Sequence, residues 1–155
     1  MDNNKKLEKE LGTFKSMIAS GPVIIKNFNG IQKTLLVKHG NKPLEELKWK
    51  FCGGKILPGL SLEENAIRKA REEIGVQVKI IRSLNPLILW QEVPESGTEK
   101  PEATVLIHYL AEIEEDPQKG EKILDMEWFD VNNLPFDSAP NIKPVIENYL
   151  NQLSI

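Results

Sequence analysis

The strongest constraint on the fold is a helix-forming segment between Ser61 and Gly75. Ser61 and Glu64 stand three residues apart as a capping box, in which each side chain satisfies a free backbone amide at the start of a helix. Gly75 favours the left-handed conformation that commonly ends a helix. The helix therefore carries one narrow apolar stripe that has to pack on a larger element, formed by Ala66, Ile67, Ala70 and Ile74.

Apolar runs on both sides of this helix indicate an extensive sheet. Residues 23–25 and 34–37 are predicted to form a hairpin, because Asn29-Gly30 between them favours a tight turn. Residues 48–52 alternate with period two and predict a third strand. Further strands are predicted over residues 76–81, 87–90, 104–113 and 123–129. Two polar segments punctuated by proline and glycine, 91–101 and 114–122, are predicted to be exposed loops.

Both ends of the chain have helical periodicity. Residues 1–20 are predicted to contain an amphipathic helix that ends at Gly21-Pro22 and has an apolar face of Leu7, Leu11, Phe14 and Ile18. This helix either packs on its own domain or joins two copies in a homodimer. Residues 140–155 are predicted to contain a C-terminal helix with the stripe Val145, Ile146, Tyr149 and Leu153.

This order of elements predicts an α/β sandwich. Strands interrupted by one central helix and flanked by terminal helices imply a mixed sheet with helices on both faces. A length of 155 residues suits one domain with a single core, so residues 1–155 are predicted to form one domain.

Composition limits the classes of partner. The chain has 20 basic and 23 acidic residues and a net charge of −3, without a basic block, which argues against duplex nucleic acid as a partner. No apolar run approaches the roughly 20 residues that span a bilayer, so no membrane partner is expected. A single cysteine, Cys52, and a polar start without a secretory leader favour a cytoplasmic protein.

The segment around the central helix resembles the Nudix box of the Nudix hydrolase family, whose pattern is G-x5-E-x7-R-E-U-x-E-E-x-G-U with U aliphatic. Residues 54–76 fit it without a gap. The matching residues are Gly54, Arg68, Glu72, Glu73, Gly75 and Val76, with Ala70 as a small apolar variant at the first U position. Leu60 and Lys69 stand where the pattern has glutamates. The resemblance implies the Nudix-type α/β/α sandwich.

The resemblance also implies an activity, namely hydrolysis by water of a nucleoside diphosphate linked to another group. Glutamates on the box helix would hold Mg²⁺ or Mn²⁺, a hard cation that offsets phosphate charge and activates water. Glu72 and Glu73 are the candidate catalytic and metal-binding residues, and Arg68 is expected to orient their carboxylates. Glu121 is the candidate third ligand, preferred to Glu114 and Glu115 because it closely precedes the last strand.

Lys69 changes the expected chemistry. Positions 69, 72 and 73 lie on one helix face, but an ammonium cannot ligate a cation and pairs instead with Glu73. We therefore hypothesise that Lys69 partly takes the electrostatic role of a metal ion. Two main functions stay open, a hydrolase and a weakened or inactive nucleotide-binding or sensor module. A protein-interaction scaffold that uses the terminal helices is a third.

Four residues are candidates for binding a small-molecule nucleotide substrate. Gly53 and Gly54 would let the backbone approach the phosphates closely. Arg71 could reach a phosphate, although it could equally be a solvated surface residue. Trp90 could stack on a base beside the 91–101 loop as a lid, or belong to the core. His108 is expected to be structural, and Cys52 has no acid or base partner in sequence that would make it a nucleophile.

Overall fold

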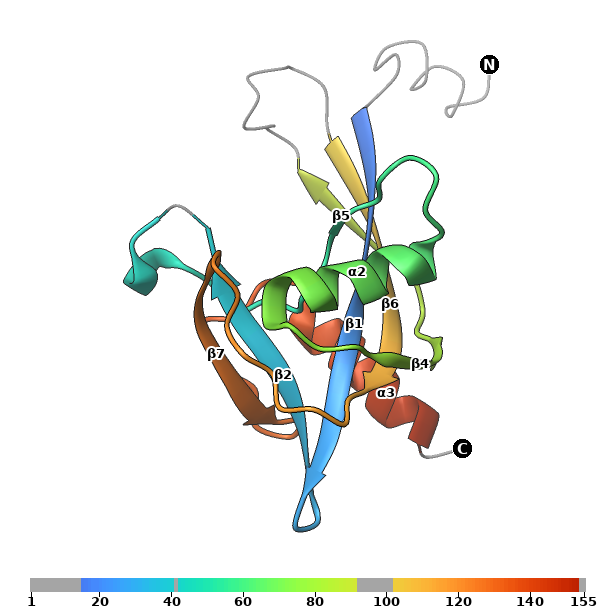
Figure 1. Ribbon diagram of the computed structural model, residues 1–155. Helices are drawn as coiled ribbons and strands as arrows, with labels where there is room; N and C mark the ends of the chain where they lie inside the picture. Colours follow the sequence, from blue (N-terminus) through green and yellow to red (C-terminus); the bar gives the residue numbers. More distant parts are fainter. Residues whose placement is uncertain (1–14, 41, 92–101, 154–155) are drawn as a thin grey trace, which may run out of the picture.

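The computed structural model describes residues 15–40, 42–91 and 102–153 (Figure 1). No helix within these ranges is long and apolar enough to cross a membrane. The elements in chain order are β1 (Lys15–Phe28), β2 (Ile31–His39), η1 (Leu44–Glu46), β3 (Gly54–Lys55), α2 (Leu62–Ile74), β4 (Lys79–Ser83), β5 (Leu87–Gln91), β6 (Glu102–Glu112), β7 (Ile123–Asp130) and α3 (Ile142–Leu153).

The strands form one mixed sheet organised around β1. Its order is β4-β6-β1-β2-β7, with β3 paired to β1 and β5 paired to β6. The first part of β1, from Lys15 to Ile24, runs parallel to β6. The last part, from Ile25 to Phe28, pairs antiparallel with β2. One long strand thus joins the two halves of the sheet, which diverge beyond it in Figure 1.

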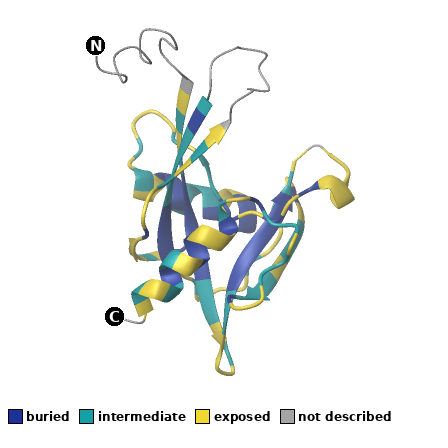
Figure 2. Ribbon diagram, turned by 180° about the vertical axis from the view of Figure 1, so that it is seen from behind, coloured by how far each residue is buried: buried dark blue, intermediate teal, exposed yellow. Residues whose placement is uncertain are grey.

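The two helices cover opposite faces of this sheet, which confirms the predicted α/β sandwich (Figure 1). Successive strand residues point to opposite faces, so neighbours divide between two apolar clusters. Val23 and Leu36 pack with the α3 residues Ile142 and Ile146. The second cluster joins strands to α2 and includes Ile24, Leu35, Val37, Ala70, Ile74 and Ala111. Figure 2 shows these buried strands beneath the C-terminal helix.

Local signals placed several elements correctly. The turn between β1 and β2 has positive φ at Asn29 and Gly30, 54° and 93°, as a tight hairpin requires. At the start of α2, Ser61 Oγ accepts a 3.0 Å hydrogen bond from the Glu64 amide. Gly75 ends the helix at φ 69°, and its N–H donates to Arg71 O. The predicted C-terminal helix is present as α3.

The predicted N-terminal helix is wrong where it can be compared. Residues 15–20 belong to β1 and pair with β6, from Lys15 opposite Glu102 to Ser20 opposite Ile107. Ile18, assigned to the apolar helix face, is 46 % exposed on the strand. Hydrogen bonding to a distant strand outweighs a local three-to-four periodicity over so few residues. Residues 1–14 lie outside the described part of the chain.

The strand predicted over residues 48–52 is also wrong. Only isolated bridges occur there, Lys50 with Val37 and Trp49 with Ser138. Trp49 and Phe51 are nevertheless buried, 6 % exposed each, so their alternation reports burial and not regular pairing. The segment crosses from one partner to another, which prevents a continuous ladder.

The capping box predicts a stability effect. Ser61→Ala removes the acceptor for the Glu64 amide and is expected to lower the free energy of unfolding by about 1 kcal/mol. Urea denaturation followed by circular dichroism measures this change. Ser83→Ala, at the exposed end of β4, is the matched control and should change stability by less than about 0.5 kcal/mol. Equal effects of the two substitutions would contradict the role of the cap.

Candidate functional site

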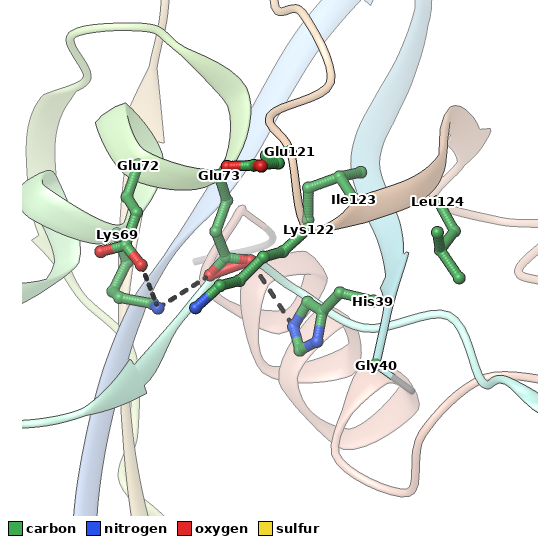
Figure 3. A pocket seen from close by; sticks show the side chains of 9 residues that line it. All are labelled: His39, Gly40, Lys69, Glu72, Glu73, Glu121, Lys122, Ile123 and Leu124. Atoms are coloured by element: carbon green, nitrogen blue, oxygen red, sulfur yellow. Dashed lines mark hydrogen bonds and ion pairs between the residues drawn. The ribbon is translucent and has the colours of Figure 1, made fainter. Parts of the chain in front are cut away.

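A cleft of about 580 Å³ lies beside the C-terminal half of α2. It is lined by His39 at the end of β2 and Gly40 after it, by Lys69, Glu72 and Glu73 on α2, and by residues 121–124, which lead into β7 (Figure 3). Three elements distant in sequence therefore meet at the part of α2 that carries the predicted metal ligands. Arg68 lies on the same helix and reaches this cluster through Glu72.

Glu73 is the most buried acid of the cleft, with its side chain 6 % exposed. The Gly53 amide donates a 3.0 Å hydrogen bond to its Oε1. Oε2 has no hydrogen-bond partner among the described residues. Burial raises the pKa of the Glu73 carboxyl, while the Gly53 amide and the Lys69 ammonium act in the opposite direction. Ionised Glu73 therefore lacks full compensation for its lost solvation.

His39 lies 3.5 Å from that unpaired oxygen, measured from Nε2 to Oε2 of Glu73. Burial lowers the pKa of His39, and the positive charges of Lys50 and Lys69 lower it further. Its imidazole is consequently neutral at pH 7, so the contact is not an ion pair there.

Lys69 lies between the two glutamates of the box. Its Nζ is 3.5 Å from Oε1 of Glu72 and 3.6 Å from Oε1 of Glu73. The side chain is 17 % exposed, and its stem passes over Gly54, where an added Cβ would lie 2.8 Å from Lys69 Cε. Gly54 thus makes room for Lys69. The expected pairing with Glu73 is present, together with a second contact to Glu72.

Glu72 is more open, with 45 % of its side chain exposed. Arg68 Nη1 donates a 2.8 Å hydrogen bond to its Oε2. Arg68 therefore directly contacts one of the carboxylates that it was expected to orient.

A buried asparagine that the sequence interpretation missed fixes this arrangement. Asn65 is fully buried, and its Nδ2 donates 3.0 Å hydrogen bonds to Ser20 Oγ and to Gly54 O. Its Oδ1 accepts a 2.8 Å hydrogen bond from Arg68 Nη2. The available signal was spacing, since Asn65, Lys69 and Glu73 lie four residues apart in a column beside the apolar stripe.

Glu121 reaches the cleft through a loop that packs on the end of α2. The Gly120 amide donates a 2.8 Å hydrogen bond to Glu73 O, and an added Cβ at Gly120 would lie 2.8 Å from the carbonyl oxygens of Glu72 and Glu73. Glu121 lines the cleft, but Figure 3 shows its carboxylate apart from that of Glu73. Within the described ranges, no three His, Cys, Asp or Glu side chains form a group arranged to hold a metal ion.

A second hollow of about 330 Å³ is bordered by Gly53 and Gly54 and shares His39 with the cleft. Its lining includes Phe51, Leu89, His108 and Asn141. His108 Nε2 lies 3.2 Å from Asn141 Nδ2, and burial lowers the His108 pKa to about 4. Both glycines therefore border this second hollow and are not part of the lining of the cleft beside α2.

The structure does not bring the other candidate residues to either hollow. Arg71 donates a hydrogen bond to Gln77 instead of facing the cleft. Trp90 is the next-to-last residue of β5 and is 56 % exposed, so the alternative that it belongs to the core is wrong. Residues 92–101 of the expected lid lie outside the described part of the chain. Burial raises the pKa of Cys52, which keeps the thiol protonated and agrees with the absence of a nucleophilic role.

Removing the Asn65 amide should destabilise the protein. Asn65→Ala removes a hydrogen-bond partner from Gly54 O and from Arg68, and is expected to cost about 2–4 kcal/mol of unfolding free energy. Urea denaturation measures the loss. Asn132→Ala, at an exposed turn position, is the control and should stay within about 0.5 kcal/mol. A loss at Asn65 no larger than that of the control would show that the network contributes little.

The lowered pKa of His108 predicts acid sensitivity. In the unfolded chain His108 binds a proton below its ordinary pKa of 6.5, whereas in the folded chain it binds one only below about pH 4. The free energy of unfolding therefore falls as pH falls through this window. The difference between these two pKa values corresponds to about 3 kcal/mol of unfolding free energy. Unfolding curves between pH 4 and 8 for the natural chain and His108→Gln measure it. The natural chain should lose about 3 kcal/mol more than the variant, and parallel losses would refute the assignment.

Comparison with known proteins supports the resemblance seen in the box. A family model described as NUDIX domain matches residues 18–149. A search of curated proteins gave no significant match. Among solved structures, a NUDIX hydrolase from Nitrosomonas europaea superposes with a TM-score of 0.71 at 18 % identity, covering 89 % of this chain and 90 % of that one.

Two further structures have the same fold. A MutT protein from Methanosarcina mazei Go1 gives a TM-score of 0.70 at 17 % identity, over 92 % of this chain and 98 % of that one. A C. elegans Ap4A hydrolase, solved as a binary complex, gives 0.68 at 19 % identity, over 89 % and 98 %. These superpositions establish the shared fold, and the family model covers most of the chain. The chain therefore belongs to the NUDIX domain family.

Proposed function

We propose that this chain is a divalent-metal-dependent hydrolase that cleaves a phosphoanhydride bond in a nucleoside diphosphate linked to another group, with water as the nucleophile. Family membership and the fold shared with proteins named as hydrolases support this proposal. The substrate would be a small nucleotide, and a cytoplasmic location agrees with the single cysteine.

The unpaired Oε2 of Glu73 is the observation that carries the proposal. A buried carboxylate oxygen without a hydrogen bond is costly, and such atoms call for a missing partner. This oxygen belongs to a side chain that lines the cleft, and oxygen donors are what Mg²⁺ and Mn²⁺ prefer. The residues present therefore fit a hard cation. When bound, the ion would offset phosphate charge and lower the pKa of a bound water.

The chain's own residues would prepare this chemistry by orientation. Gly53 fixes Oε1 of Glu73, which leaves Oε2 as the oxygen available to a cation. Arg68 fixes Glu72 in the same way, and Asn65 fixes Arg68. Lys122 adds a positive charge to the cleft lining that could meet a substrate phosphate. Glu121, from the same lining, is proposed to bind the cation after a change of rotamer.

A binding or sensor module is the second candidate, and one observation favours it. Lys69 makes ionic contacts with both glutamates and so competes with a cation for them. A chain with this lysine could hold a nucleotide without turning it over. The two candidates differ in whether hydrolysis accompanies binding.

Hydrolysis of a panel of nucleoside diphosphate derivatives with Mg²⁺ or Mn²⁺ tests the proposal. We expect activity in the natural chain that falls about 100-fold or more in Glu73→Gln, because the variant keeps the shape but loses the ligand charge. Glu112→Gln is the control and should retain activity, because it alters an acid on β6 whose side chain is 52 % exposed.

Two outcomes would contradict the hydrolase. In the first, the natural chain is inactive on the whole panel, while Lys69→Glu is active. In the second, calorimetry shows tight nucleotide binding without metal and without turnover, which would support the sensor.

A further inference from the structure

Most of the carboxylate oxygens on α2 that could bind a cation are already occupied. Oε2 of Glu72 accepts from Arg68 at 2.8 Å, and Oε1 of Glu72 lies 3.5 Å from Lys69 Nζ. Oε1 of Glu73 accepts from Gly53 at 3.0 Å and lies 3.6 Å from Lys69 Nζ. Oε2 of Glu73 is the remaining oxygen, and it has no hydrogen bond among the described residues.

Lys69 is largely covered and contacts both glutamates. Its side chain is 17 % exposed and lies over Gly54, where an added Cβ would lie 2.8 Å from Lys69 Cε. Gly54 is in turn fixed through its carbonyl by buried Asn65. The ammonium therefore lies between the two glutamates.

We infer that Lys69 limits this site to one divalent cation, anchored at Oε2 of Glu73, and that this cation binds together with the phosphates of the substrate and not to the free protein. One open oxygen on α2, even with a carboxylate oxygen of Glu121 added from the same lining, is too few for stable binding of a hard cation, which needs further oxygen ligands. Phosphate oxygens supply them. The inference rests on the proposed function for the identity of the phosphate ligand.

The charges of the cleft support this order of binding. Lys69, Glu72 and Glu73 carry a net charge of −1 when ionised, whereas a glutamate at position 69 would make it −3. The lysine thus weakens the attraction of the empty site for a free cation. At the same time its ammonium, with that of Lys122, weakens the repulsion of an incoming phosphate.

Binding of Mn²⁺ by isothermal calorimetry tests the inference without measuring activity. We expect the natural chain to bind free Mn²⁺ weakly, at no more than one ion per chain. Lys69→Gln should bind it at least about tenfold more tightly, because a fixed charge next to the ligands is removed. Lys69→Arg keeps the charge and should resemble the natural chain. Lys79→Gln, which removes an exposed charge elsewhere, should also leave Mn²⁺ binding unchanged.

A second titration uses a preformed 1:1 complex of Mn²⁺ with inorganic pyrophosphate as the probe. The natural chain should bind this complex at least about tenfold more tightly than Mn²⁺ alone. Circular dichroism confirms that each variant is folded, and Lys69→Arg provides the comparison if Lys69→Gln is not.

Three results would overturn the inference. They are two Mn²⁺ ions bound by the natural chain without phosphate, an unchanged Mn²⁺ affinity in Lys69→Gln, or a pyrophosphate complex bound no better than the free ion. If Lys69→Gln is unfolded, tighter Mn²⁺ binding by Lys69→Arg than by the natural chain would also overturn the inference. Because none of these readouts requires turnover, an inactive chain with the expected Mn²⁺ affinities would overturn only the proposed function.

Discussion

The geometry of the cleft depends on the buried amide of Asn65. Its Nδ2 holds Gly54 O and Ser20 Oγ, so it joins the start of the box to the central strand β1. Its Oδ1 holds Arg68, which in turn holds Glu72. A buried amide that satisfies three partners specifies one arrangement, because any shift of α2 leaves several polar groups unpaired at once. The orientation of Glu72 thus depends, through Arg68, on one side chain that lies outside the cleft, whereas Glu73 is held by the Gly53 amide.

The same helix combines two different requirements in adjacent columns. Ala66, Ala70 and Ile74 form an apolar column, fully buried against the sheet, and the two alanines let the helix lie close to β1. Asn65, Lys69 and Glu73 form a polar column beside it, with Asn65 and Glu73 also buried. Each polar member has at least one contact with a neighbour along the chain or with the backbone of residues 53 and 54. Burial of the apolar column stabilises the fold. Part of this stabilisation offsets the free-energy cost of removing the polar column from water.

Sequence reasoning succeeded where the structural cause is local. The limits of α2 follow from its own caps, and the β1–β2 turn follows from Asn29-Gly30. It failed at residues 15–20, where pairing with β6, more than 80 positions away, decides the conformation. In the site, the box spacing located Glu72, Glu73 and Lys69 in one cleft. Asn65 was missed because its partners Ser20 and Gly54 become neighbours only in the folded chain. Whether Glu121 is a ligand depends on a loop conformation, which no residue pattern encodes.

At position 69 the residue type changes the chemistry of the site while the fold of the family is kept. A glutamate there would place three acids on one helix turn, with like-charge repulsion at spacings of three and four. Lysine replaces both repulsions by attractions, and each such pair contributes about 0.2–0.5 kcal/mol, so the change favours the metal-free protein by roughly 1–2 kcal/mol. In the glutamate form, a bound metal ion would offset the repulsion among the three acids. With lysine at position 69 there is less repulsion for the ion to offset. The lysine form is therefore stable before any ligand binds, and its demand for a free divalent cation is correspondingly lower.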